Sequence, residues 1–112
     1  MPGDPIFKTI QEIHDKMVDA GNEWADLNAA AEALEEGLKS LKAQLMVSST
    51  HTSAAGKEME ALADETYREY VKNMTNARKL ANRARVKFDS IKAWIELYRS
   101  AESTRRAEMT MR

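Results

Sequence analysis

Residues 6–45 read IFKTIQEIHDKMVDAGNEWADLNAAAEALEEGLKSLKAQL, and apolar residues recur in this stretch in alternating steps of four and three. The positions are Ile6, Ile10, Ile13, Met17, Ala20, Trp24, Leu27, Ala31, Leu34, Leu38, Leu41 and Leu45. This is the heptad repeat of a coiled coil, lettered a to g, in which positions a and d form an apolar seam against another helix. Asp4 and Pro5 are typical of an N-cap and a first helical residue. With Ile10 at position a, the repeat predicts one helix over about residues 5–46.

A polar segment separates this helix from a second repeat. Residues 47–53, VSSTHTS, predict a connection, and a short helix is expected over about residues 54–63. Asp64 is a typical N-cap, so we expect a second long helix over about residues 65–109. Its seam positions are Tyr67, Tyr70, Met74, Ala77, Ala81, Ala84, Phe88, Ile91, Ile95 and Tyr98.

Two long helices joined by a short connection predict an antiparallel hairpin. We therefore expect an all-α, coiled-coil-like fold with a single helical domain over residues 1–112. Leu80, Trp94 and Leu97 fall outside the seam of the second helix, and a bare hairpin buries little apolar surface. These residues predict dimerisation into a helical bundle. The alternative is that the short middle helix covers them.

The charge changes sign along the chain. Residues 1–46 carry four Lys against nine Asp or Glu, whereas residues 72–112 carry eleven Lys or Arg against four Asp or Glu. Five cations of the second long helix share heptad position e, and we call them the basic stripe: Arg78, Arg85, Lys92, Arg99 and Arg106. Further cations beside the stripe are Lys79, Arg83, Lys87 and Arg105.

The basic stripe has several possible roles. Charges at position e often form salt bridges between paired helices. In an antiparallel pair e faces e, and Glu35 is the one acid at position e of the first helix, so we expect the stripe to lack partners within its own chain. Regularly spaced free cations bind nucleic-acid phosphates in a salt-sensitive way. They equally bind an acidic protein surface, including that of a second copy. Residues 103–112 are either a frayed end or the tip of such a contact, through Arg105 and Arg106.

Catalysis and cofactor binding lack candidate residues. The chain has no cysteine, and His14 and His51 lie too far apart in the sequence to suggest a metal site. No glycine-rich phosphate loop is present, and no base is placed to activate a loop hydroxyl. We expect no enzyme activity, no cofactor, no metal and no small-molecule substrate. No apolar run approaches the roughly 20 residues that span a bilayer, and the first residues lack a signal-peptide pattern. We therefore expect no membrane association and a cytoplasmic location.

Residues 81–109, ANRARVKFDSIKAWIELYRSAESTRRAEM, resemble the C-terminal segment of small helical proteins encoded by tailed bacteriophages and prophages. The resemblance extends loosely through LADETYREYVKNM, residues 62–74. It implies a phage accessory protein in the cytoplasm of a bacterial host, with a role in handling DNA or countering host defences. It supplies no active site.

Two functional hypotheses follow from the residues and the resemblance together. The leading one is a non-enzymatic helical rod that contacts nucleic-acid phosphates through the basic stripe. The alternative is an adaptor or inhibitor that uses the same edge to bind a protein, for example a host defence or DNA-processing protein.

Overall fold

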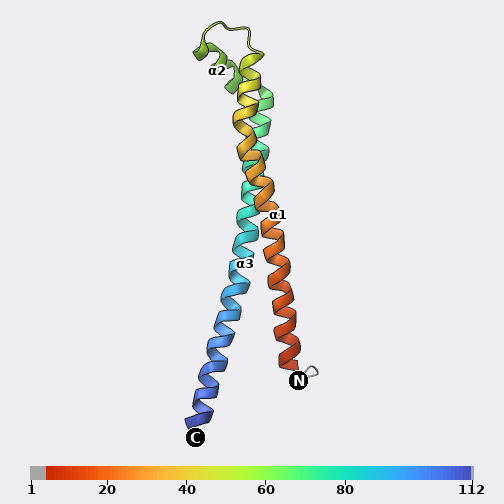
Figure 1. The fold of residues 1–112 in the computed structure, drawn as a ribbon, viewed down its shortest axis with the longest axis vertical. Coiled ribbons are helices and arrows are strands. Elements are labelled where there is room, and N and C mark those ends of the chain that lie inside the picture. Colours follow the sequence, from red (N-terminus) through yellow and green to blue (C-terminus); the bar gives the residue numbers. More distant parts are fainter. Residues whose placement is uncertain (1–4, 112) are drawn as a thin grey trace. The chain divides into compact units, whose positions relative to one another are not determined.

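The computed structural model describes residues 5–111, with side chains from residue 9 onward, and contains three helices and no strand within that range (Figure 1). Helix α1 covers Pro5–Val47, α2 covers Ala54–Ala63 and α3 covers Glu65–Met111. The all-α prediction is confirmed. The expected N-cap at residue 4 lies outside the described residues.

The helix ends follow local capping chemistry. The Ser53 hydroxyl accepts a hydrogen bond from the Gly56 backbone N–H at 3.0 Å, which satisfies a free donor at the start of α2. Asp64 does the same for α3, because its Oδ1 accepts the Thr66 backbone N–H at 2.7 Å. The N-cap expected at Asp64 is therefore confirmed. Helix α1 continues through Gly21 without a break.

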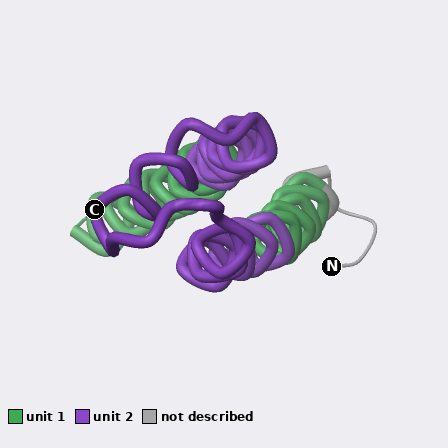
Figure 2. The backbone as a smooth tube through the Cα atoms, turned by 90° about the horizontal axis from the view of Figure 1, so that it is seen from above, with its two compact units in different colours: residues 1–24, 83–112 green, residues 25–82 purple. Residues whose placement is uncertain are grey.

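The chain divides into two compact units (Figure 2). Unit 1 contains residues 1–24 and 83–112, so it pairs the first part of α1 with the last part of α3. Unit 2 contains residues 25–82, which include the rest of α1, the whole of α2 and the start of α3.

Unit 2 is held by a narrow apolar seam and by polar contacts across it. Ala31 of α1, Ala61 of α2 and Ala81 of α3 are buried. The Tyr70 hydroxyl donates a hydrogen bond to the Leu34 carbonyl at 2.6 Å, which links α3 to α1. Other contacts fasten α2 to the end of α1 and to the connection: Lys42 with Glu58 at 2.7 Å, His51 with Glu60 at 3.5 Å, and the Ser49 hydroxyl with Glu60.

Unit 1 pairs its two helix segments through small residues and one aromatic stack. Ala20 of α1 and Ala84 of α3 are buried. Trp24 stacks on Phe88 with ring centroids 5.8 Å apart. A Cβ atom at Gly21 would lie 3.1 Å from Cε2 of Phe88, so the missing side chain lets the ring approach the α1 backbone.

The fully buried core of the described residues consists of alanines alone: Ala20, Ala31, Ala61, Ala81 and Ala84. Among the side chains that the structure describes, the larger seam residues are at most partly covered, because two paired helices shield each of them from two sides only. The alternative that the short middle helix covers the extra apolar residues is wrong for Leu80, which shares unit 2 with α2 and remains 50% exposed. Trp94 and Leu97 of unit 1 are 49% and 71% exposed.

A double-mutant cycle at Gly37 and Tyr70 tests the packing of unit 2. Glycine inside a helix normally costs about 1 kcal/mol relative to alanine. A Cβ at Gly37 would overlap the Tyr70 hydroxyl, so Gly37→Ala should displace that hydroxyl from the Leu34 carbonyl. We expect a net change near zero, because a hydrogen bond worth about 1 kcal/mol is lost. In a Tyr70→Phe background the nearest ring atom lies at an ordinary 3.6 Å, and Gly37→Ala should stabilise by about 1 kcal/mol.

Urea unfolding of the four proteins in this cycle measures the coupling. Equal effects of Gly37→Ala in both backgrounds would show that the tyrosine hydroxyl does not occupy the space next to Gly37.

Candidate functional site

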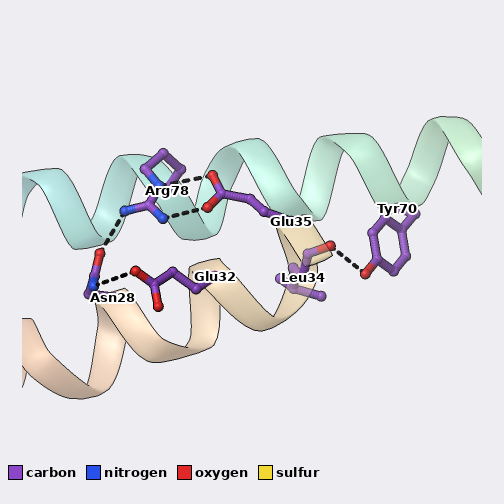
Figure 3. Close-up of polar contacts among 6 residues, drawn as sticks. All are labelled: Asn28, Glu32, Leu34, Glu35, Tyr70 and Arg78. Atoms are coloured by element: carbon purple, nitrogen blue, oxygen red, sulfur yellow. Dashed lines mark hydrogen bonds and ion pairs between the residues drawn. The ribbon is translucent and has the colours of Figure 1, made fainter. Parts of the chain in front are cut away.

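The first member of the basic stripe, Arg78, is fully engaged within its own chain (Figure 3). Its Nε and Nη2 donate to the two carboxylate oxygens of Glu35 at 3.0 and 2.5 Å. Its Nη1 donates to Oδ1 of Asn28 at 2.8 Å, and the Asn28 amide donates to Glu32 at 3.2 Å. Arg78, Glu35 and Asn28 all occupy position e of their helices, so e positions of α1 and α3 contact each other here.

This fork-like pairing changes the protonation equilibria of both partners. The hydrogen bonds from Arg78 lower the pKa of the Glu35 carboxyl, against a smaller opposing effect of partial desolvation. The same hydrogen bonds raise the pKa of Arg78. Lys42 and Glu58 behave in the same way, since their direct hydrogen bond raises the pKa of Lys42 and lowers that of Glu58.

We expect the stability of the protein to depend on pH through these two carboxylates. Each has a folded-state pKa below its ordinary value of 4.5, so its contribution is present above pH 4.5 and is lost as the pH falls through the lower, folded-state value. A Glu35→Gln/Glu58→Gln variant should therefore be less stable to urea than the wild type at pH 7. The difference should shrink at a second pH well below 4.5, where the same carboxylates of the wild type become protonated.

Glu36→Gln is the matched control, because Glu36 is exposed and forms no ion pair with a described residue. Its difference from the wild type should change less with pH. A gap between the double variant and the wild type that is the same at both pH values contradicts the assignment.

Three further cations are paired, and the expectation that the stripe lacks partners in its own chain is wrong for part of it. Lys87 lies 3.6 Å from Glu23 of α1. Within α3, Arg85 lies 3.7 Å from Asp89, one helical turn onward, and Arg105 lies 3.0 Å from Glu102, one turn back. Comparing e positions alone could not find these pairs, because Glu23 occupies position g and the other two carboxylates lie on the same helix. The Lys87 and Arg85 pairs are exposed on both sides, and Glu102 is the one half-buried partner in the third pair. Surface pairs of this kind contribute little to stability.

Five of the nine candidate cations form no ion pair with any residue in the described part of the chain: Lys79, Arg83, Lys92, Arg99 and Arg106. All five are exposed. Lys92, Arg99 and Arg106 belong to unit 1 and follow one another at intervals of seven residues, about 10 Å along a helix. We call these three the free edge.

The free edge borders an apolar groove in unit 1. The two helix segments of this unit diverge toward the ends of the chain (Figure 1). A groove of about 350 Å³ lies between them. Its lining residues are Ile10, Ile13, His14 and Met17 of α1, and Trp94, Ile95, Tyr98, Arg99, Glu102, Ser103 and Arg106 of α3. Trp94 stacks on Tyr98 with ring centroids 5.7 Å apart.

The sequence pattern did not reveal this groove. Seam spacing continues unbroken through Ile10, Ile13 and Met17, and it predicts that these residues are covered by the opposite helix. Ile10 is instead 46% exposed. The one available signal was the polar substitution at Glu102 and Arg105, where the α3 seam ceases to be apolar.

Other kinds of site receive no support from the described residues. Over residues 5–111 no three His, Cys, Asp or Glu side chains gather as a metal ion requires. No helix in the same range has the length and apolar character of a bilayer span.

No protein-family model, curated protein or solved structure matches the chain.

Proposed function

We propose that this chain is a non-enzymatic helical binding protein whose ligand is another protein. The observation that supports the proposal is the juxtaposition, in unit 1, of an apolar groove with the free edge. A groove lined by aliphatic and aromatic side chains gains free energy when an apolar partner displaces water from it. The neighbouring cations add charge selectivity.

A protein ligand accounts for both features, whereas a nucleic-acid duplex, whose bases are stacked in its interior, accounts for one. A sugar–phosphate backbone can pair with Lys92, Arg99 and Arg106, but it offers no apolar surface to fill the space beside Ile10 and Trp94. Four of the nine candidate cations are also neutralised by carboxylates of the same chain. With a net charge of −1, the chain has no overall attraction for phosphate polymers.

The proposal includes an antiparallel hairpin made by α1 and α3, and self-association of hairpins into a helical bundle. Its support is the shallow core, together with Leu80, Val86 and Leu97, which are 50%, 65% and 71% exposed. Sedimentation equilibrium over a concentration series tests this part. A single species of monomer mass throughout would remove self-association from the proposal.

Nucleic-acid binding is the second candidate function. Lys79 and Arg83 favour it, because they are exposed, carry no ion pair with a described residue and share α3 with the free edge. Binding of this kind weakens steeply with salt, since each neutralised phosphate releases counterions. Gel shifts with single- and double-stranded DNA at low and moderate salt measure it directly.

The proposal also includes an origin in a tailed phage or prophage and a location in the bacterial cytoplasm, on the resemblance of residues 81–109 alone. The deciding experiment is affinity capture from a nuclease-treated bacterial extract with three baits. We expect the wild type and a Lys79→Glu/Arg83→Glu variant to retain a protein, and a Lys92→Glu/Arg99→Glu/Arg106→Glu variant to lose it. A salt-sensitive DNA shift with no retained protein would favour the second candidate.

A further inference from the structure

We infer that the groove of unit 1 takes one amphipathic α-helix from a partner protein, with acidic residues about one heptad apart along one flank of that helix. This inference rests on the proposed function and names the partner's chemistry. The helix would lie between α1 and α3 as a third helix, with its apolar stripe toward Ile13, Met17 and Ile95. Helix-in-groove binding of this kind uses apolar anchors three, four and seven residues apart.

Both walls of the groove are apolar. On the α1 side, Ile10, Ile13 and Met17 are consecutive seam residues and therefore form one continuous strip along the helix. On the α3 side, the stacked rings of Trp94 and Tyr98 form a flat wall, with rings only 13° from parallel. Because α1 and α3 diverge here, they do not cover these surfaces for each other. A bound helix would bury them instead.

The charged residues of the lining leave the α3 rim of the groove positively charged. Arg99 and Arg106 line it and form no ion pair with a described residue. The one carboxylate in the lining, Glu102, is 3.0 Å from Arg105 and is thus already paired. On the opposite wall, His14 lies 3.8 Å from Asp15. The α3 rim therefore keeps two unneutralised guanidinium groups about 10 Å apart, which matches carboxylates one heptad apart on a bound helix.

A second copy of this chain fits the groove less well. The heptad-spaced acids Glu12 and Asp19 occupy position c of α1, on the side away from its apolar seam. That seam already faces α3, as the Trp24–Phe88 stack of unit 1 shows. α1 thus offers no free face that combines an apolar stripe with an acidic flank. On α3 the acids Asp89 and Glu96 are one heptad apart, but Asp89 already lies 3.7 Å from Arg85. The occupant the charges favour is a helix of another protein.

Two matched synthetic peptides test the inference against the full chain. Both are three-heptad amphipathic helices with Leu at positions a and d. One carries Glu at every e position and the other carries Lys there. Fluorescence anisotropy of labelled peptides measures affinity at low salt. We expect the Glu peptide to bind the wild type about tenfold more tightly than the Lys peptide, because attraction is replaced by repulsion at two exposed cations.

Charge reversal at the rim should invert this preference. An Arg99→Glu/Arg106→Glu variant should bind the Lys peptide more tightly than the Glu peptide. A Lys79→Glu/Arg83→Glu variant changes the net charge equally but lies outside the groove lining, so it should keep the wild-type preference. Both pairs of side chains are exposed, and circular dichroism of each variant verifies that the helices are retained.

The inference and the proposed function fail on different outcomes. Equal affinity of the wild type for both peptides, or a preference unchanged by Arg99→Glu/Arg106→Glu, rules out the acidic helix. Full retention of an extract protein by the Arg99→Glu/Arg106→Glu variant also rules out the acidic helix, but it leaves the proposal of a protein ligand intact. Binding of neither peptide, with dissociation of a homo-oligomer by the rim variant, assigns the groove to a second copy. DNA binding without protein capture contradicts the proposed function itself.

Discussion

Phe88→Ala should lower the free energy of unfolding by about 2 kcal/mol, roughly half the loss expected of a fully buried phenylalanine. The ring of Phe88 contacts two residues of α1 within unit 1. It stacks on Trp24 with centroids 5.8 Å apart, and it lies against the backbone of Gly21, where a Cβ would approach it to 3.1 Å. Removing the ring leaves a void beside Gly21 and Trp24. Gly21 has no side chain to fill it, and the Trp24 ring loses the stacking partner that it packs against.

The matched control is Trp94→Ala, which also breaks an aromatic stack in unit 1. Trp94 is 49% exposed and lines the open groove, so we expect a loss of at most about 1 kcal/mol. Urea unfolding followed by circular dichroism measures both variants. Equal losses would show that the Trp24–Phe88 stack is no better packed than the groove wall.

Ala31→Leu should destabilise the protein by about 2 kcal/mol, because it inserts a large side chain where α1 has no free space. Ala31 is 0% exposed, and it lies on α1 between Asn28 and Glu35, the two residues that Arg78 of α3 bridges. A leucine there should push the helices of unit 2 apart and strain both of those hydrogen-bonded contacts.

Ala30→Leu is the control for Ala31→Leu, since the adjacent residue is exposed and the substitution is chemically identical. We expect a change within about 0.5 kcal/mol there. Thermal or urea unfolding of the two variants provides the comparison. Stabilisation by Ala31→Leu would show instead that the alanine seam opens to admit a larger residue, as a loosely packed coiled coil can do.

Much of the fold followed from the repeat. The spacing from Ile6 to Leu45 predicted a helix over about residues 5–46, and α1 covers Pro5–Val47. The all-α class is confirmed, whereas the single domain, the hairpin and the dimer stay predictions. The repeat succeeds because a heptad pattern is a local property. Each turn of helix depends on neighbouring residues and on the absence of breakers, and residues 6–111 contain no proline.

The candidate site was predictable only in part. The heptad spacing places the cations of the basic stripe on one edge of α3. It also identifies Glu35 as the one acid at position e of the first helix. Which cations remain free did not follow, because Lys87 pairs across the helices with an acid at another heptad position, and Arg85 and Arg105 pair along their own helix.

By itself the sequence determined where helices form, which residues make the seam and which edge of α3 is basic. These are properties of one helix at a time, set by a repeat of about two turns. Only the tertiary structure decided that Arg78 is neutralised by Glu35 and that an apolar groove opens beside Arg99 and Arg106. Both depend on how closely two helices approach at each level, and that distance is set by side-chain volumes on both helices together, which spacing along one chain does not encode.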